Sequence, residues 1–508
     1  MLTLYQKMSE RNENIRNLLQ TRVLEHGEKT FLTDEASGRS YSYRTFLDIV
    51  ERTASTLGAH GIRKGDVVSL LLPNSAEYVI AYFACWTIGA IAGPINSLLK
   101  PEEIEWTLGN SESKLLLIAS AFLPQIEGRK TPPHLIFDDA TAVGREADAN
   151  PAAPEIDAND DAVIIYTSGT TGKPKGCLLT HANLIANARQ IVEWLGFGPD
   201  DRLLSVMPLF HMNAVSVTTM SALYAGGSTI VTPKFSASRF WEIVERYRIT
   251  SFGSVATMLS MLLAKKSDGQ PAPSNSLRFA MCGSAPVPVE VLNRFEETFG
   301  CLVVEGYGLS ESTCRSTFNP PNKSRRPGSC GLPIGNEMAV FDDSNNPVAD
   351  GELGEIVLRG PNIFRGYFKN EAATKKAFEG GWFHTGDIGY RDADGFYFIA
   401  DRKSDMVIRG GENIYPREID ELLFTHPAIA AAAVIGVPDE IYGEEVEAFV
   451  VLRQGHTASE NEIIDFCRSH LADYKCPKRI HFLDEIPKGP TGKLLKRKLA
   501  KLRLAERS

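Results

Sequence analysis

A loop that combines glycines, hydroxyl groups and lysines follows an apolar run in the first half of the chain. The run Ala162–Tyr166 is rich in β-branched residues and predicts a buried strand. The stretch Tyr166–Gly176 holds three glycines, two lysines and four serine or threonine residues. Glycines let backbone N–H groups face an anion, and the hydroxyls and lysines add donors and positive charge. We therefore expect a polyphosphate-binding loop with the contact residues Thr167, Ser168, Gly169, Thr170, Thr171, Gly172 and Lys175.

Other motifs decide between this interpretation and a plain Gly/Ser/Thr-rich turn. The loop is not a Walker A motif, because Lys173 is followed by Pro174 instead of serine or threonine. The stretch Y-T-S-G-T-T-G-x-P-K-G instead resembles the phosphate-loop signature of the AMP-forming adenylating enzymes. This superfamily comprises acyl-CoA synthetases, peptide-synthetase adenylation domains and luciferases. Its other motifs occur here in order, and the resemblance covers roughly residues 10 to 500.

The resemblance implies an α/β fold with two domains joined by a hinge. A large N-terminal domain of several subdomains with helix-covered sheets would occupy residues 1–401. Residues 402–405 would form the hinge, with Ser404 at the pivot position, where the superfamily often has aspartate or lysine. A small, mobile α+β domain would follow at 406–508. The length alone favours two or more domains.

The segment Glu305–Ser312 resembles the Y-G-x-T-E motif of the superfamily. The resemblance implies that Tyr307 stacks on adenine, that Ser310 reaches phosphate and that Glu311 holds Mg²⁺. A single carboxylate suits Mg²⁺, which fills its octahedron with phosphate oxygens and water. Serine replaces the usual threonine at 310 and keeps the hydroxyl.

Two further segments have both a structural and a functional interpretation. A lone histidine beside apolar residues is more often a core or cap residue, but the resemblance places His211 among the catalytic residues, near the substrate carboxylate. The turn at Gly283, Ser284 and Ala285 fits either a tight strand–helix connection or a surface on which the adenine base lies.

The last motifs lie around the expected hinge and in the C-terminal domain. The resemblance implies that Asp387 binds the ribose and that Arg402 contacts ribose or phosphate. Gly410 and Gly411 would leave room for the thin pantetheine arm of the thiol substrate. Lys493, in the loop Pro487–Lys493, would be the catalytic lysine.

These parts together imply a two-step ligase that uses ATP, Mg²⁺ and CoA. A carboxylate attacks the α-phosphorus of ATP and releases pyrophosphate, and a thiol then displaces AMP from the acyl group. Two anions meet in the first step, so Mg²⁺ on Glu311 and the compact charge of Lys493 are needed between them. Lys493 and the thiol need the same face of the acyl carbon, which explains a small domain that rotates.

Two other functions share this fold. An adenylating enzyme that loads a carrier-protein pantetheine differs only in its thiol partner, and the segments Gly410–Pro416 and Asp473–Pro477 resemble the CoA-using branch. A non-catalytic binding protein would have lost Lys493, Glu311 or the loop glycines, and all of them are present.

The acid is not indicated. Segments Ser236–Trp241 and Lys323–Gly328 faintly resemble the carnitine/crotonobetaine-CoA ligase branch. Arg315 follows the Glu311 motif directly; arginine is mostly exposed, so a solvated side chain is the first expectation. If it instead points into the acyl pocket, its charge would favour an acid with a second polar or anionic group.

Composition indicates an ordinary globular protein of the cytoplasm. The net charge of −9 argues against nucleic acid as the main partner, although Lys475–Ser508 is basic. Eight cysteines without a CxxC pair are expected to be reduced, buried thiols. No signal peptide is expected at the start, and the most apolar window, Val79–Pro94, is short for a membrane span and predicts a core helix running into a strand. The oligomeric state is left open.

Overall fold

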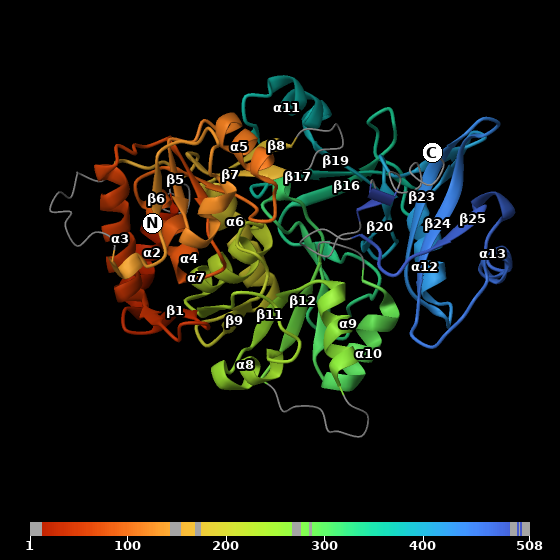
Figure 1. The fold of residues 1–508 in the computed structure, drawn as a ribbon, viewed down its shortest axis with the longest axis horizontal. Helices are drawn as coiled ribbons and strands as arrows, with labels where there is room; N and C mark the ends of the chain where they lie inside the picture. Colours follow the sequence, from red (N-terminus) through yellow and green to blue (C-terminus); the bar gives the residue numbers. More distant parts are fainter. Residues whose placement is uncertain are drawn as a thin grey trace.

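The computed structural model describes residues 13–142, 154–167, 174–266, 276–283, 287–487 and 495, 496, 498 and 499. Figure 1 shows a large domain, which holds most of the chain, and a small C-terminal domain at one end of the long axis. The α/β fold with a large N-terminal and a small C-terminal domain is thus confirmed.

The first sheet of the large domain contains the two neighbouring strands that flank the expected phosphate loop. Its strand order is β18-β8-β7-β4-β3-β5-β6, parallel from β7 to β6 and antiparallel at β8 and β18. The strands are β3 (Val67–Leu71), β4 (Ile91–Pro94), β5 (Leu115–Ile118), β6 (His134–Ile136), β7 (Asp161–Thr167), β8 (Lys175–Thr180) and β18 (Gly366–Tyr367). The helices and 3₁₀ turns that connect them are α3 (Tyr43–Ala59), α4 (Ala76–Thr87), α5 (Pro101–Asn110), η1 (Ser120–Gln125) and η2 (Ala140–Ala142).

The apolar window Val79–Pro94 folds as expected. Every residue of α4 is buried, and β4 follows it in the middle of the sheet. Among the described residues, no helix is both long and apolar enough to cross a bilayer. The cysteines are free thiols, and all except the half-buried Cys330 are buried.

The second sheet has the order β13-β12-β11-β9-β10-β1-β2 and is parallel except for the β1–β2 hairpin. Its strands are β1 (Thr30–Asp34), β2 (Ser40–Ser42), β9 (Arg202–Ser205), β10 (Ser228–Val231), β11 (Ser251–Ser254), β12 (Phe279–Cys282) and β13 (Leu302–Glu305). The helices of this part are α2 (Ile15–His26), α6 (His181–Leu195), α7 (Ser221–Ala225), α8 (Phe240–Tyr247), α9 (Ala256–Lys265), α10 (Val289–Phe299) and a π-helix, η3 (Asn213–Met220). Thr180 caps α6, because its side chain accepts from Asn183 N.

Smaller elements complete the large domain. After β13 come the short 3₁₀ turn η4 (Ser310–Ser312) and the hairpin β14 (Thr317–Phe318) and β15 (Leu332–Pro333). An antiparallel sheet of order β16-β17-β19-β20 then leads toward the small domain. Its strands are β16 (Glu337–Phe341), β17 (Gly354–Arg359), β19 (Phe383–Arg391) and β20 (Tyr397–Arg402), with α11 (Glu371–Ala377) and η5 (Glu379–Gly381) inserted before β19.

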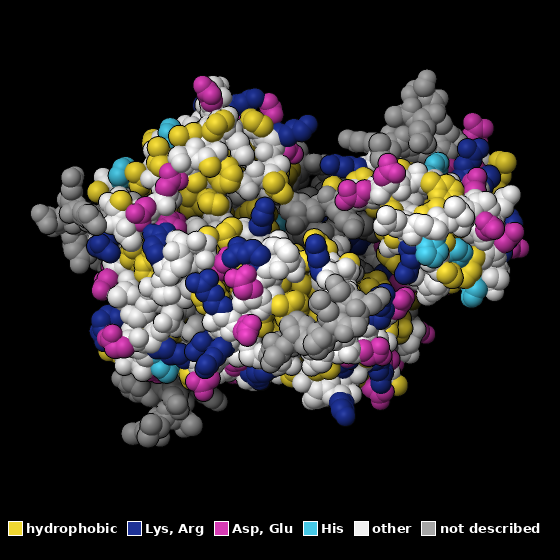
Figure 2. Space-filling model, turned by 60° about the horizontal axis from the view of Figure 1, so that its bottom comes forward, with side chains coloured by type: hydrophobic (Ala, Val, Ile, Leu, Met, Phe, Trp, Pro, Cys, Tyr) yellow, Lys and Arg dark blue, Asp and Glu magenta, His cyan; other side chains and the backbone are white. Residues whose placement is uncertain are grey.

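The small domain has its own hydrophobic core, from Val407 to Ile480. The long hairpin of β23 (Ile429–Asp439) and β24 (Gly443–Leu452) is flanked by β21 (Val407–Arg409), β22 (Glu412–Ile414) and β25 (Arg479–Phe482). The helical elements are α12 (Pro416–Phe424), α13 (Glu460–Arg468) and η6 (Asp473–Lys475). On the face in Figure 2, basic and acidic side chains are interspersed over both domains.

Candidate active site

The base of the expected phosphate loop is a pair of antiparallel strands. β7 ends at Thr167 and β8 begins at Lys175, and these two residues are opposite each other in the ladder. The two described ends of the expected phosphate loop therefore lie side by side. The contact residues Ser168, Gly169, Thr170, Thr171 and Gly172 lie outside the described residues.

Glu311 lies beside this base, although 144 residues separate it from Thr167 in sequence. Thr167 Oγ1 donates to Glu311 Oε1 over 3.4 Å, and the Tyr367 hydroxyl donates to the same oxygen over 3.1 Å. Lys175 Nζ lies 4.9 Å from the centre of the Tyr367 ring. The structure thus brings the loop base and the expected metal carboxylate together, as the sequence predicts.

Tyr367 joins these groups, and the sequence analysis missed it. It comes from β18, a strand of two residues that pairs with β8 at Cys177. A two-residue strand has no hydrophobic period that a sequence pattern could reveal. The sequence signal for this contact is the pair of aromatic residues Phe364 and Tyr367, three positions apart. Their ring centres lie 4.9 Å from each other.

The surroundings of Glu311 fit a magnesium ion. Burial raises the pKa of the carboxyl group above its ordinary value, while the Tyr367 and Thr167 hydroxyls and the charge of Arg402 oppose that rise. A nearby cation would therefore stabilise the charged form. Oxygen donors of this type suit Mg²⁺. Among the described residues, no cluster of three or more metal-binding side chains surrounds it, so phosphate oxygens and water would complete the coordination.

Asp387 is the centre of the expected nucleotide contacts. The Tyr307 hydroxyl donates to Asp387 Oδ2 over 2.6 Å, and Arg402 Nε lies 3.3 Å from Asp387 Oδ1. Asp387 and Arg402 are opposite each other in the β19–β20 ladder. Residues of two other motifs thus meet at the carboxylate of Asp387. Burial raises the pKa of the Tyr307 hydroxyl, and the negative charge of Asp387 raises it further, so this hydroxyl stays a donor.

Gly283 directly follows β12, at a place where only glycine fits. A Cβ atom built there would lie 2.7 Å from both Gly306 O and Arg315 Nη2. The next two residues of this expected adenine turn, Ser284 and Ala285, lie outside the described residues. Ser310 is half-buried at the start of η4, directly before Glu311.

His211 stands just before the π-helix η3. Its Nε2 atom is buried and has no hydrogen-bond partner among the described residues, and the Phe210 ring packs at 4.6 Å. Burial lowers the pKa of the imidazole to about 4, so the ring is neutral at pH 7. Asn213, the first residue of the π-helix, also has a buried amide without a partner in this part of the chain. No sequence pattern predicted a π-helix, a form that is common at functional sites.

Arg315 is where the first sequence expectation is wrong. Only 2% of this residue is exposed, so the side chain is not solvated. It belongs to the segment that returns from η4 along Tyr307, because Ser316 N donates to Tyr307 O over 2.8 Å. Tertiary packing, which composition does not reveal, buries it.

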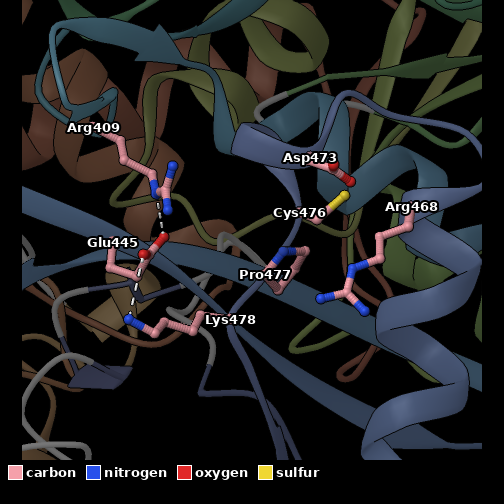
Figure 3. A pocket seen from close by; sticks show the side chains of 7 residues that line it. All are labelled: Arg409, Glu445, Arg468, Asp473, Cys476, Pro477 and Lys478. Carbon is pink, nitrogen blue, oxygen red and sulfur yellow. Dashed lines mark hydrogen bonds and ion pairs between the residues drawn. The ribbon is translucent and has the colours of Figure 1, made fainter. Parts of the chain in front are cut away.

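The C-terminal residues lie on the small domain. Gly410 and Gly411 have φ of 62° and 94°, left-handed values that favour glycine, and they form the turn between β21 and β22. Beside this turn is a hollow of about 490 Å³. Figure 3 shows three basic side chains among its lining residues: Arg409, Arg468 and Lys478. Glu445 accepts from Arg409 Nε at 2.6 Å and lies 3.7 Å from Lys478 Nζ.

Lys493 lies outside the described residues, but the chain next to it is anchored. Three residues later, Lys496 Nζ lies 3.2 Å from Asp420 Oδ2, and Leu499 is fully buried in a small core with Ile486. Asp420, Asp401 and Asp405 hold the pKa of Lys496 above its usual value. The segments on both sides of the expected lysine loop are therefore fixed to the small domain.

Comparison with known proteins agrees with this arrangement. A model of the AMP-binding enzyme family matches residues 19–368, and one of the AMP-binding enzyme C-terminal domain matches residues 418–493. The chain is 36% identical over 493 residues to a sulfoacetate–CoA ligase of Cupriavidus necator, with 95% of this chain and 96% of that protein covered. It is 36% identical over 470 residues to an oxalate–CoA ligase of Arabidopsis thaliana, covering 89% and 91%. It is 35% identical over 503 residues to a crotonobetaine/carnitine–CoA ligase of Escherichia coli, covering 93% and 96%.

Two solved structures with the same fold contain ATP, and one of them also contains magnesium ion. ATP-bound MatB from Rhodopseudomonas palustris superposes with a TM-score of 0.90 at 31% identity, covering 96% of this chain and 99% of that one. An o-succinylbenzoate coenzyme A synthetase of Bacillus subtilis, in complex with ATP and magnesium ion, gives a TM-score of 0.85 at 33% identity, covering 95% and 99%.

The chain belongs to the AMP-binding enzyme family. It is an AMP-forming acyl-CoA synthetase that uses ATP, Mg²⁺ and CoA, and it forms an acyl-AMP intermediate before the acyl group passes to CoA. The faint resemblance to crotonobetaine/carnitine–CoA ligases is confirmed, because such a ligase is among the relatives. Ligases named for other acids are relatives as well.

Proposed function

We propose that the site described above activates a small carboxylic acid with each of its residues in a defined role. The contacts around Glu311 and Asp387 are the observation that carries this proposal. They bring together the base of the phosphate loop, a buried carboxylate and a ribose-binding group from distant parts of the chain.

In the first half-reaction, the chain orients ATP and the acid for in-line attack. Thr167, Lys175 and the loop between them bind the β- and γ-phosphates, and Tyr307, Asp387 and Arg402 hold the adenosine. Glu311 and the phosphate oxygens hold magnesium, which supplies neutralising charge when it is bound. An oxygen of the substrate carboxylate bonds to the α-phosphorus, and the bond from this phosphorus to pyrophosphate breaks. Lys493 places its charge between the two anions.

In the second half-reaction, the thiol sulfur of CoA bonds to the acyl carbon and AMP leaves with the oxygen it gained. We propose residues 402–405 as the hinge between the large domain, 1–401, and the small domain, 406–508. The turn Gly410–Gly411 then presents the pantetheine arm. Three basic and two acidic side chains line the neighbouring hollow, and Arg409 and Lys478 share the carboxylate of Glu445. Its basic groups support CoA over a carrier protein as the thiol, because CoA carries a pyrophosphate.

His211 is proposed to contact the substrate carboxylate. Its neutral ring and its buried, unpartnered Nε2 atom support this role, because a neutral imidazole can donate one hydrogen bond without a fixed charge. The names of the relatives do not settle the acid, since they include sulfoacetate, oxalate and crotonobetaine/carnitine.

A panel of carboxylic acids tests the proposal. The enzyme is incubated with ATP, Mg²⁺ and each acid, with and without CoA, and pyrophosphate, AMP and acyl-CoA are quantified. With CoA we expect pyrophosphate, AMP and acyl-CoA in equal amounts; without CoA we expect pyrophosphate but no acyl-CoA, because the AMP stays in the acyl-AMP intermediate. ADP and inorganic phosphate as products would contradict the reaction. Rapid transfer to a phosphopantetheinylated carrier protein, with none to CoA, would favour the carrier-loading alternative.

A further inference from the structure

The backbone of Arg315 makes several hydrogen bonds, whereas its side chain makes almost none. Asn187 of α6 holds the backbone, because its Nδ2 donates to Arg315 O over 2.6 Å and its Oδ1 accepts from Arg315 N over 3.3 Å. Asn362 Nδ2 also donates to Arg315 O over 3.1 Å. The position of this residue is therefore well determined.

The guanidinium group has almost no such support. Nη1 donates to Cys314 O at a long 3.4 Å, and the Phe318 ring centre lies 5.4 Å from Cζ. Nε and Nη2 are buried without a hydrogen-bond partner among the described residues, and no ion pair there includes Arg315. An unpaired buried charge is costly, and arginine stays charged under all ordinary conditions. Such a group points to an anion that arrives from outside the chain.

The Arg315 guanidinium lies on the same face of the second sheet as Asn213, the first residue of the π-helix η3. Gly253 of β11 is opposite Met281 of β12, and Gly283 follows two residues later, so side chains at 253 and 283 point to one face. A Cβ on Gly283 would lie 2.7 Å from Arg315 Nη2, and a Cβ on Gly253 would lie 3.0 Å from Asn213 Oδ1. Strand spacing puts these two glycines about 8 Å apart.

Two polar side chains with buried, unpartnered atoms thus lie over neighbouring strands. One is the amide of Asn213, two residues after His211; the other is the guanidinium of Arg315, four residues after Glu311. The glycines at 253 and 283 let these groups approach the sheet closely. The guanidinium and the segment that follows His211 therefore lie on the same side of this sheet.

We infer that Arg315 binds a second anionic group, carboxylate or sulfonate, at the far end of a short acid substrate. This inference rests on the proposed function and names its substrate class. A plain hydrocarbon end would leave the guanidinium unpaired, and a quaternary ammonium end would add a like charge beside it. Long fatty acids and carnitine-type acids are therefore disfavoured, despite the kinship with crotonobetaine/carnitine–CoA ligases.

Matched acids of equal length test this inference in the full-length enzyme. Succinate is compared with butanoate, glutarate with pentanoate, and 3-sulfopropanoate with butanoate, with carnitine as the cationic probe. Pyrophosphate release gives kcat/KM for each acid in the wild type and in the variants Arg315→Leu, Arg315→Lys and Arg326→Leu. Arg326 is the matched control, because it is an arginine of the same region whose head pairs with Asp392 and Asp394 at the surface.

We expect the wild type to favour the dianionic acid of each pair. Arg315→Leu should shift the ratio of the two kcat/KM values toward the monoanion by at least about tenfold, Arg315→Lys should retain part of the preference, and Arg326→Leu should leave it unchanged. The KM for ATP and the melting temperature of Arg315→Leu should stay near those of the wild type, because the guanidinium supports neither nucleotide nor fold.

Other outcomes overturn the inference separately from the reaction class. An unchanged ranking of acids in Arg315→Leu, with pyrophosphate still released, refutes a substrate contact at this residue. A raised KM for ATP with an unchanged ranking would assign the guanidinium to the nucleotide. A large fall in melting temperature, with equal loss for all acids, would make its role structural. No pyrophosphate from any acid in the wild type would instead refute the proposed function.

Discussion

The buried ion pair of Asp420 and Lys496 makes a prediction about the catalytic lysine loop. Lys496 lies three residues after Lys493 and is fixed to α12 through Asp420. Asp420→Asn removes the negative charge but keeps an oxygen that can accept from Val434 N. Lys496 then stays buried without its main counter-charge. We expect the segment next to Lys493 to detach from the small domain for much of the time.

The size of the effect follows from the geometry. Two charges 3.2 Å apart attract by about 5 kcal/mol at an effective dielectric constant of about 20. Breaking a buried pair by removing one partner typically costs about 3–5 kcal/mol. A loss of 3 kcal/mol changes the docking equilibrium about 150-fold. The buried Leu499 supplies further anchoring, so we expect adenylation to slow by between about tenfold and about 150-fold.

Two assays separate the half-reactions. Acid-dependent exchange of pyrophosphate into ATP measures adenylation, and mixing supplied acyl-AMP with CoA measures thioester formation. Asp420→Asn should slow the first and spare the second. Glu418→Gln on the same helix is the control, since the pair of Glu418 with Lys475 is more exposed and such pairs contribute about 1 kcal/mol or less. Exchange at the wild-type rate in Asp420→Asn, or equal damage to both half-reactions, would refute the reasoning.

Four further predictions concern single residues. Lys493→Ala should slow adenylation by orders of magnitude yet still convert acyl-AMP and CoA to thioester; equal loss of both would mean that the residue is structural or binds CoA. Gly411→Leu should spare pyrophosphate exchange and block thioester formation, and a parallel loss of exchange would show that the strain at φ 94° disrupts the small domain. Tyr367→Phe removes a hydroxyl bond to Glu311 and should raise the Mg²⁺ concentration for half-maximal rate about tenfold; an unchanged value would remove Tyr367 from the metal site. The pKa of His211, lowered to about 4 against about 6.5 unfolded, gives stability that is present above pH 6.5 and lost as pH falls toward 4. Urea unfolding at pH 7 and pH 5 should therefore show that His211→Gln loses about 2 kcal/mol less than the wild type; identical losses would place the imidazole in water.

Local chemistry was enough to predict some elements of the large domain. The apolar run at Val79–Pro94 became α4 and β4, and the run Ala162–Tyr166 became part of β7, because hydrophobic patterning acts over a few residues. The meeting of Glu311 with Thr167 could be expected only through the family resemblance. No periodicity links residues 144 positions apart.

The features that the sequence did not indicate all depend on tertiary packing. The π-helix η3 and the two-residue strand β18 have no pattern of their own, yet they position Asn213 and Tyr367. Arg315 was expected in solvent because arginine is mostly exposed in proteins. The segment that carries it instead folds back along Tyr307 and buries it. The average exposure of a residue type is a poor guide in a functional site, because a polar group there can be buried for its function despite the free-energy cost of burial.

The ladder between β19 and β20 continues one residue beyond Arg402, because Lys403 N donates to Gly386 O over 2.8 Å. The chain then turns at residues 403–405. A rotation of the small domain about these residues would leave the ribose contacts of Asp387 in place. We therefore expect the AMP part of the intermediate to stay bound at Asp387 while the small domain rotates. The bound AMP would then hold the acyl carbon in position for attack by the thiol of CoA.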